Sequence, residues 1–190
     1  LRAEKRLDDL VLDEQLRLKM DRLCGMADHA FQQQQLQHMP WVMFYGPKGS
    51  GKKELASRLA AYCGRSLLWF DPTQAEQGTL DDLLRRAQRE ALLRGAVLYV
   101  GPLRGDLLND NGRELVKRII TYPSMLILGV EQTQPPRMTI DHSMQEVQLL
   151  IPPEPARLVL WQRVVPESIR ADDLSLESIA RAFHLTPGEI

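Results

Sequence analysis

The first regular pattern of apolar positions lies between residues 12 and 37 and has the spacing of a helix. Apolar side chains recur there along one face, separated by charged and amide side chains. This is the pattern of an amphipathic helix that packs one side against a core. The residues on the apolar face are Leu16, Met20, Leu23, Cys24, Ala27 and Phe31.

Short apolar runs follow, and they alternate with segments of helical spacing. Several of them lack alternating polar positions, which is typical of strands that are buried on both faces. Strands that alternate with helices indicate a parallel sheet covered by helices on both sides, so we predict an α/β fold. The predicted strands span residues 41–46, 66–71, 96–101, 124–131 and 144–152.

The helical segments between these runs carry start and stop residues. A helix is predicted over 53–64, with Gly64 as its C-terminal stop. Thr79 is predicted to cap the N-terminus of the next helix, which stops at Gly95. A further helix is predicted over 110–121.

The composition changes after Ile151. The segment PPEP at 152–155 ends the fifth predicted strand, because proline cannot continue a ladder of hydrogen bonds. Two short helices are then predicted in ARLVLWQRVVP and SLESIARAFHL, the second of them capped by Ser175.

These patterns divide the chain into three parts. They are an N-terminal helical segment (1–40), an α/β domain (41–152) and the start of a helical module (153–190). The chain begins at Leu1 rather than Met, and it ends at Ile190 inside a helical pattern. We therefore expect it to be part of a longer protein.

Composition and charge are those of an ordinary globular chain. The 190 residues are 44% hydrophobic and 26% charged, with a net charge of −1, so nucleic acid and anionic membranes are not expected partners. No apolar run is long enough to span a bilayer. Cys24 and Cys63 lie in apolar helical patterns without metal-type spacing. They predict buried thiols and a reducing, cytoplasmic setting.

The segment WVMFYGPKGSGKK joins the first predicted strand to a helix and carries a phosphate-loop pattern, G-x-x-x-x-G-K. In such a loop, glycines let backbone N–H groups point at phosphate oxygens, the helix N-terminus adds positive charge, and the lysine reaches the terminal phosphates. We predict that it binds ATP or ADP; the alternative is a glycine-rich turn without a ligand. The predicted binding residues are Gly46, Pro47, Lys48, Gly49, Ser50, Gly51, Lys52 and Lys53.

The groups that hold a metal ion are missing from this pattern. The position that supplies a hydroxyl to Mg²⁺ in phosphate loops is Lys53, and an ammonium cannot ligate a cation. The third apolar run reaches Gly101-Pro102 where acidic residues that bind Mg²⁺ are expected. Asp106, the nearest acid, is interpreted as a solvated turn residue. The sequence therefore predicts no catalytic residue, no metal ligand and little or no ATP hydrolysis.

In this arrangement the chain resembles the AAA+ family of ATPases over nearly its whole length. Residues 7–23 resemble the helix before the loop, GPKGSGKK the Walker A motif, VLYVGP the Walker B position and LILGVEQ the sensor 1 strand. VQLLIPPEPARLVLWQRVV resembles the exit into a helical lid, with Arg157 in a Pro-x-x-x-x-Arg-like spacing, and SLESIARAFHLTPGEI resembles a lid segment. The resemblance implies a P-loop NTPase fold. It is a three-layer α/β/α sandwich with a five-stranded parallel sheet of order 5-1-4-3-2, followed by a partial lid.

More narrowly, the chain resembles the degenerate first module of bacterial proteins with two tandem AAA+ modules. This resemblance implies a role in assembly or regulation, with other AAA+ modules of the same chain or of a homo-oligomer as partners. It also implies an arginine finger before the fifth strand, where Arg137 is the only arginine; a solvated loop arginine is the alternative. Gln132 stands near the sensor 1 position, but a surface glutamine is the simpler interpretation.

Other residues indicate structural roles. The histidines share no metal-type spacing, and Trp41, Trp69 and Trp161 are interpreted as core residues. The arginines of the helix before Gly95 alternate with acids, which favours a solvated face. Two alternative functions stay open. One is an active ATPase with unusual metal ligation, and the other is a clamp-loader-like DNA-associated module, which the neutral net charge disfavours.

Overall fold

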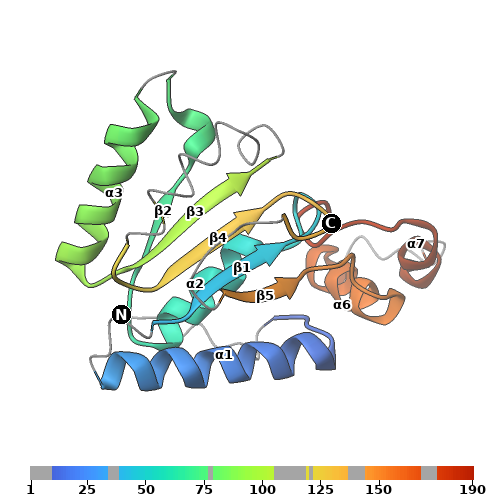
Figure 1. Ribbon diagram of the computed structural model, residues 1–190. Helices are drawn as coiled ribbons and strands as arrows, with labels where there is room; N and C mark the ends of the chain where they lie inside the picture. Colours follow the sequence, from blue (N-terminus) through green and yellow to red (C-terminus); the bar gives the residue numbers. More distant parts are fainter. Residues whose placement is uncertain are drawn as a thin grey trace.

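Five parallel strands form one sheet in the computed structural model of the chain, which describes residues 10–33, 39–76, 79–104, 119, 122–136, 144–167 and 175–190. Their order across the sheet is β2-β3-β4-β1-β5 (Figure 1). The predicted order 5-1-4-3-2 is this order read from the other edge, so it is confirmed. The strands are β1 (Trp41–Tyr45), β2 (Leu67–Phe70), β3 (Val97–Leu103), β4 (Leu126–Val130) and β5 (Met144–Gln148).

Helices cover both faces of this sheet. Consecutive residues of a strand point to opposite faces, so an apolar strand gives each face side chains that a helix can bury. Phe44 belongs to the core cluster beneath α1 (Glu14–Gln32) and α2 (Lys52–Tyr62). The next residue back, Met43, belongs to the cluster on the opposite face, where α3 (Leu80–Arg94) packs. The predicted α/β fold with helices on both sides of the sheet is therefore confirmed (Figure 1).

Local signals set the helix ends largely as predicted. The Asp13 carboxylate accepts a backbone N–H of the first turn and so starts α1 at Glu14, later than the predicted residue 12. The stops predicted at Gly64 and Gly95 lie at the ends of α2 and α3. α3 begins directly after Thr79, but the Thr79 hydroxyl donates to the Glu76 carbonyl (2.9 Å) instead of capping the helix. Thr79 is thus the N-cap residue, as predicted, but without a side-chain hydrogen bond to the helix.

All five strands differ by one to a few residues from their predicted bounds, and the difference at β3 reaches the candidate site. β3 continues through Gly101 and Pro102 to Leu103, and the Gly101-Pro102 peptide is cis. The pairing of β3 with β4 shifts register between Val100 and Leu103. β5 ends at Gln148, where the chain turns toward the prolines that start the next helix. The helix predicted over 110–121 lies outside the described residues except for Ile119.

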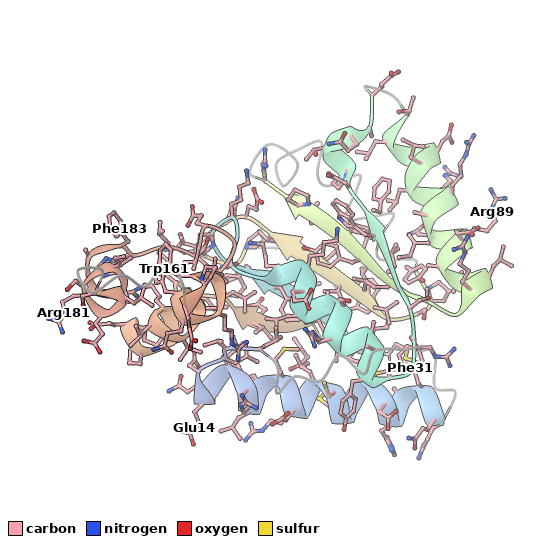
Figure 2. The ribbon with its side chains drawn as sticks, turned by 180° about the vertical axis from the view of Figure 1, so that it is seen from behind. Glu14, Phe31, Arg89, Trp161, Arg181 and Phe183 are labelled. Carbon is pink, nitrogen blue, oxygen red and sulfur yellow. The ribbon has the colours of Figure 1, made fainter. Side chains whose placement is uncertain are left out.

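The tryptophans do not all lie in the core. Trp41 is buried, as predicted. The prediction for Trp69 is wrong, since 47% of the residue is exposed. The reason is that β2 is an edge strand, which has a neighbour on one side only. Trp161 is partly buried on α6 (Figure 2).

Beyond the sheet, two short helices form a pair at the carboxyl ends of the strands (Figure 1). They are α6 (Glu154–Val164) and α7 (Leu176–Ala182), as predicted, and the Ser175 hydroxyl caps α7 by accepting from the Ser178 N–H. No helix in the described ranges is both long enough and apolar enough to cross a membrane.

A buried arginine joins these two helices. Arg157 on α6 is only 4% exposed. Its Nε and Nη2 donate to the carbonyl of Ala180 on α7 (3.0 and 2.8 Å), and its Nη1 donates to the carbonyl of Pro152 (2.5 Å). The sequence spacing from Pro152 to Arg157 thus corresponds to a direct contact.

We predict that Arg157→Ala lowers the free energy of unfolding by about 3 kcal/mol, because it leaves buried carbonyls without donors. Arg181→Ala is the matched control. Arg181 is largely exposed and its ion pair with Glu154 lies at the surface (Figure 2), so it should cost less than about 0.5 kcal/mol. Urea denaturation of the two variants measures the difference. Similar small losses in both would contradict a structural role for Arg157.

Candidate functional site

The phosphate-loop segment lies at the carboxyl end of β1, between β4 and β5. The Gly46 N–H donates to the Val130 carbonyl (3.2 Å), which ties the start of the loop to β4. On the other side, a Cβ atom at Gly46 would lie 2.1 Å from the carbonyl oxygen of Leu149. Only glycine fits this close approach, so the first glycine of the pattern is required by the backbone that directly follows β5.

The loop then turns into α2 without a side-chain cap. Gly51 is the N-cap residue, in the left-handed conformation, and as a glycine it provides no side-chain cap for the first turn of the helix. The first N–H groups of a helix have no partner inside the helix. Such N–H groups and the helix dipole attract anions in general, so the predicted phosphate cradle has the geometry it needs and stays a prediction.

Lys52 lies at the centre of the loop. The residue is 6% exposed, and its Nζ donates to the carbonyls of Gly46 (2.9 Å) and Pro47 (2.7 Å) and to the Ser50 hydroxyl (3.2 Å). Burial lowers the pKa of Lys52, while the carboxylate of Glu131 acts in the opposite direction. A phosphate entering the loop would favour the charged ammonium in the same way as Glu131 does.

Lys53 points elsewhere, toward the edge strand. Its Nζ lies 3.2 Å from the centroid of the Trp69 ring, a cation–π contact. The Trp69 indole N–H in turn donates to the Gly101 carbonyl (2.8 Å). These contacts connect the start of α2 through β2 to β3. They end at Gly101, one of the two positions where the sequence lacks an expected acidic residue.

A cavity of about 280 Å³ opens between these residues. One wall is the end of the loop and the start of α2, and the other is formed by the ends of β2, β3 and β4. Gly101 and Pro102, which stand where acidic residues were expected, border this cavity, and so does Glu131. The lining residues are Gly49, Ser50, Gly51, Lys52, Lys53, Glu54, Trp69, Tyr99, Gly101, Pro102 and Glu131.

Glu131 and Trp69 were missed by reasoning from the sequence. Glu131, rather than Gln132, borders the cavity at the end of β4, and its carboxylate accepts from Arg104 Nε (2.8 Å). Trp69 belongs to a run that reads as buried. The apolar pattern does not show whether a strand lies at the edge of the sheet. It also does not show which residue at the end of a strand faces the cavity.

The donors around this cavity do not fit a magnesium ion. Mg²⁺ takes oxygen ligands in octahedral geometry, yet Gly101 and Pro102 carry no side-chain oxygen and Lys53 brings a positive charge. The two carboxylates on the cavity wall, of Glu131 and Glu54, are paired with Arg104 and Arg58. Within the described ranges, no cluster of three or more His, Cys, Asp or Glu side chains could hold a metal ion.

A second cavity, of about 330 Å³, lies on the other side of the same loop. Gly49, Ser50 and Gly51 border both cavities. The remaining walls are mostly apolar and come from the segment before α1, the end of β5 and α6. Prominent among them are Leu10, Leu12, Leu150, Pro152, Ala156 and Leu160.

The C-terminal turn of the described chain packs on the loop. The Gly188 N–H donates to the Gly49 carbonyl (2.9 Å), and a Cβ atom at Gly49 would meet the Thr186 hydroxyl at 2.4 Å. Thr186 donates from its N–H and its hydroxyl to the Glu189 carboxylate (2.8 Å each), which lowers the pKa of Glu189. The loop thus has backbone contacts with the sheet and with this turn.

Several predicted residues lie away from the site or outside the described ranges. Arg137 and Asp106 are outside them, so the arginine-finger and turn predictions stay predictions. On α3, Arg85 pairs with Asp81 (2.9 Å), as expected for a solvated face. Cys24 is buried as predicted, and burial raises the pKa of its thiol to about 12.

Cys63 differs from its prediction. It is only partly buried, because it lies at the C-terminal end of α2 rather than within the helix.

In a comparison with known protein families, no family model matches the chain.

We predict that Gly49→Ala destabilises the protein more than Gly64→Ala. Both residues have positive φ, at 77° and 65°, so each alanine should cost about 1 kcal/mol in backbone strain. Only at Gly49 does the new methyl group also clash with Thr186, which should raise the loss to about 2–4 kcal/mol. Urea denaturation measures both; equal losses would show that the C-terminal turn does not rest on the loop in solution.

Proposed function

We propose that this chain is a nucleotide-binding module of the AAA+ type that binds ATP or ADP and hydrolyses it slowly or not at all. The observation that carries the proposal is the loop after β1. There a buried lysine, Lys52, and the uncapped start of α2 stand together at the carboxyl edge of a parallel sheet. These are the groups that bind phosphates in P-loop proteins.

The two cavities fit the two ends of a nucleotide. The cavity beside Lys52 offers positive charge to the phosphates. The second cavity offers aliphatic walls to a purine base and, at about 330 Å³, is in the range of small-molecule sites. Gly49, Ser50 and Gly51 border both, so we propose that a single ligand lies across the loop.

The same site supports the absence of efficient hydrolysis. Gly101 and Pro102 offer no carboxylate to a metal or to a water molecule, and Lys53 replaces the metal-binding hydroxyl. We propose that the chain acts in assembly or regulation, as one module among other AAA+ modules of its own chain or of a homo-oligomer in the cytoplasm. A module at the start of a bacterial tandem protein is the form that the sequence resembles.

One observation favours a second candidate, an ATPase with unusual metal ligation. Glu131 places a carboxylate at the end of β4, in the cavity that contains Lys52. Against this candidate, the Glu131 carboxylate is paired with Arg104. In addition, Lys53 stands where the loop would carry a metal-binding hydroxyl. We therefore rank it below the non-hydrolysing module.

We predict that Lys52→Ala weakens ATP and ADP binding at least tenfold, or about 1.4 kcal/mol, because the ammonium lies at the centre of the phosphate cradle. Isothermal titration measures the affinity, and urea denaturation checks that the variant is folded. Arg89→Ala is the control: it removes one positive charge from the exposed face of α3 (Figure 2) and should leave binding unchanged. Unchanged binding in folded Lys52→Ala would refute the proposed site.

We further predict that Lys53→Thr does not restore ATP hydrolysis. The threonine returns a hydroxyl to the loop, but Gly101 and Pro102 still provide neither a metal ligand nor a base. Release of phosphate from ATP with Mg²⁺ should stay at the level of Lys52→Ala. Substantial Mg²⁺-dependent turnover by Lys53→Thr would favour the second candidate, with Glu131 as the carboxylate to test next.

A further inference from the structure

The residue that departs from the phosphate-loop pattern has a defined place in the structure. Lys53 directly follows Lys52 at the start of α2, on the wall of the 280 Å³ cavity. Its ammonium lies on the face of the Trp69 ring, 3.2 Å from the centroid. Trp69 is held in turn by its hydrogen bond to the Gly101 carbonyl. Trp69 therefore links the unusual lysine to Gly101, where an acidic residue was expected.

We propose that the Lys53–Trp69 pair is a built-in cation that replaces a divalent metal, so that the site binds a metal-free nucleoside polyphosphate in preference to its Mg²⁺ complex. This proposal rests on the proposed nucleotide-binding function and adds the form of the ligand.

The first argument is the kind of partner that holds Lys53. Among the described residues, Lys53 makes no hydrogen bond and no ion pair; its contact is the aromatic ring of Trp69. An aromatic face attracts a cation without neutralising it. The ammonium therefore keeps its positive charge, and the N–H donors that point away from the ring stay available to an incoming anion. A carboxylate partner would have cancelled that charge.

The second argument is the distribution of the other charges around the cavity. Lys52 donates only to uncharged oxygen atoms of the loop. The two carboxylates on the cavity wall each have a cation: Glu131 pairs with Arg104 (2.8 Å), and Glu54 pairs with Arg58 (2.8 Å). Among the described residues, the cavity thus contains two lysines without ion pairs, beside the positive end of a helix.

The third argument is what a bound Mg²⁺ would meet. The divalent ion would bring further positive charge next to the Lys53 ammonium, and Gly101 and Pro102 would supply no side-chain oxygen. Mg²⁺ also neutralises part of the charge of the phosphates, which weakens their attraction to both lysines. Removal of Mg²⁺ restores that charge. The free polyphosphate is therefore the better ligand.

Titration of the whole chain with ATP, in EDTA and in excess MgCl₂ at matched ionic strength, tests the proposal. We expect ATP to bind at least about tenfold tighter in EDTA, from repulsion between close like charges. Lys53→Thr should lose this preference through weaker binding in EDTA. Arg89→Ala, which removes a charge far from the loop, should keep it.

Trp69 provides a second test, because the proposal gives its ring a role in holding the cation. Trp69→Leu should reduce the preference for metal-free ATP, whereas Trp69→Phe, which keeps an aromatic face, should retain most of it. Phosphate binding should draw Lys53 from the ring and change tryptophan emission. The Trp69→Phe variant should lose this change while it still binds ATP.

The outcomes separate this proposal from the function on which it rests. ATP binding that is equally tight or tighter with Mg²⁺ would overturn the metal-free preference and leave nucleotide binding intact. An unchanged preference in folded Lys53→Thr would overturn the role of the pair. No ATP binding in either medium would overturn both proposals.

Discussion

The close approach of three backbones at the end of β1 is the constraint on which the other features depend. The Gly46 N–H donates to the Val130 carbonyl, and the Leu149 N–H donates to the Tyr45 carbonyl (2.7 Å), so β1, β4 and β5 meet within a few atoms. No side chain fits between them at Gly46. The chain must therefore leave the sheet as a tight loop and enter α2 directly. Both cavities, both lysines and the contact with the C-terminal turn are built on that loop.

The electrostatic character of the site follows from which partners its charged groups have. Lys52 and Lys53 are held by carbonyls, a hydroxyl and an aromatic ring, none of which carries a negative charge. The carboxylate of Glu131 has an arginine of its own. An anion therefore meets positive charge that the protein has not neutralised. This arrangement supports a phosphate site that works through fixed cations rather than through a coordinated metal.

A buried arginine joins the helical pair, α6 and α7, beside the loop. Arg157 binds the end of α7 and the residue that precedes α6, and it does so from a buried position. The turn that follows α7 then contacts the loop through the backbone of Gly188 and Gly49. The loop and the helical pair are thus joined by direct contact through this turn. That connection would give a non-hydrolysing module a means of responding to a bound nucleotide.

Much of the fold was determined by local patterns in the sequence. Apolar runs marked all five strands, Gly64 and Gly95 marked helix ends, and the glycine-rich segment from Gly46 to Lys52 marked the turn from β1 into α2, because these features depend on neighbours along the chain. The strand order came from a family resemblance and is matched by the sheet.

The tertiary structure alone decided which side chains share the site. Trp69 is an exposed residue of an edge strand, and Glu131 rather than Gln132 faces the cavity. Whether a strand lies at an edge, and where its end points, depends on pairing between segments far apart in sequence, as in the contact between Trp69 and Gly101. The sequence showed a lysine at position 53 and Gly101-Pro102 where a hydroxyl and acidic residues were expected. Only the fold placed the Lys53 ammonium on an aromatic ring, because that contact joins two elements whose spacing along the chain carries no information about it.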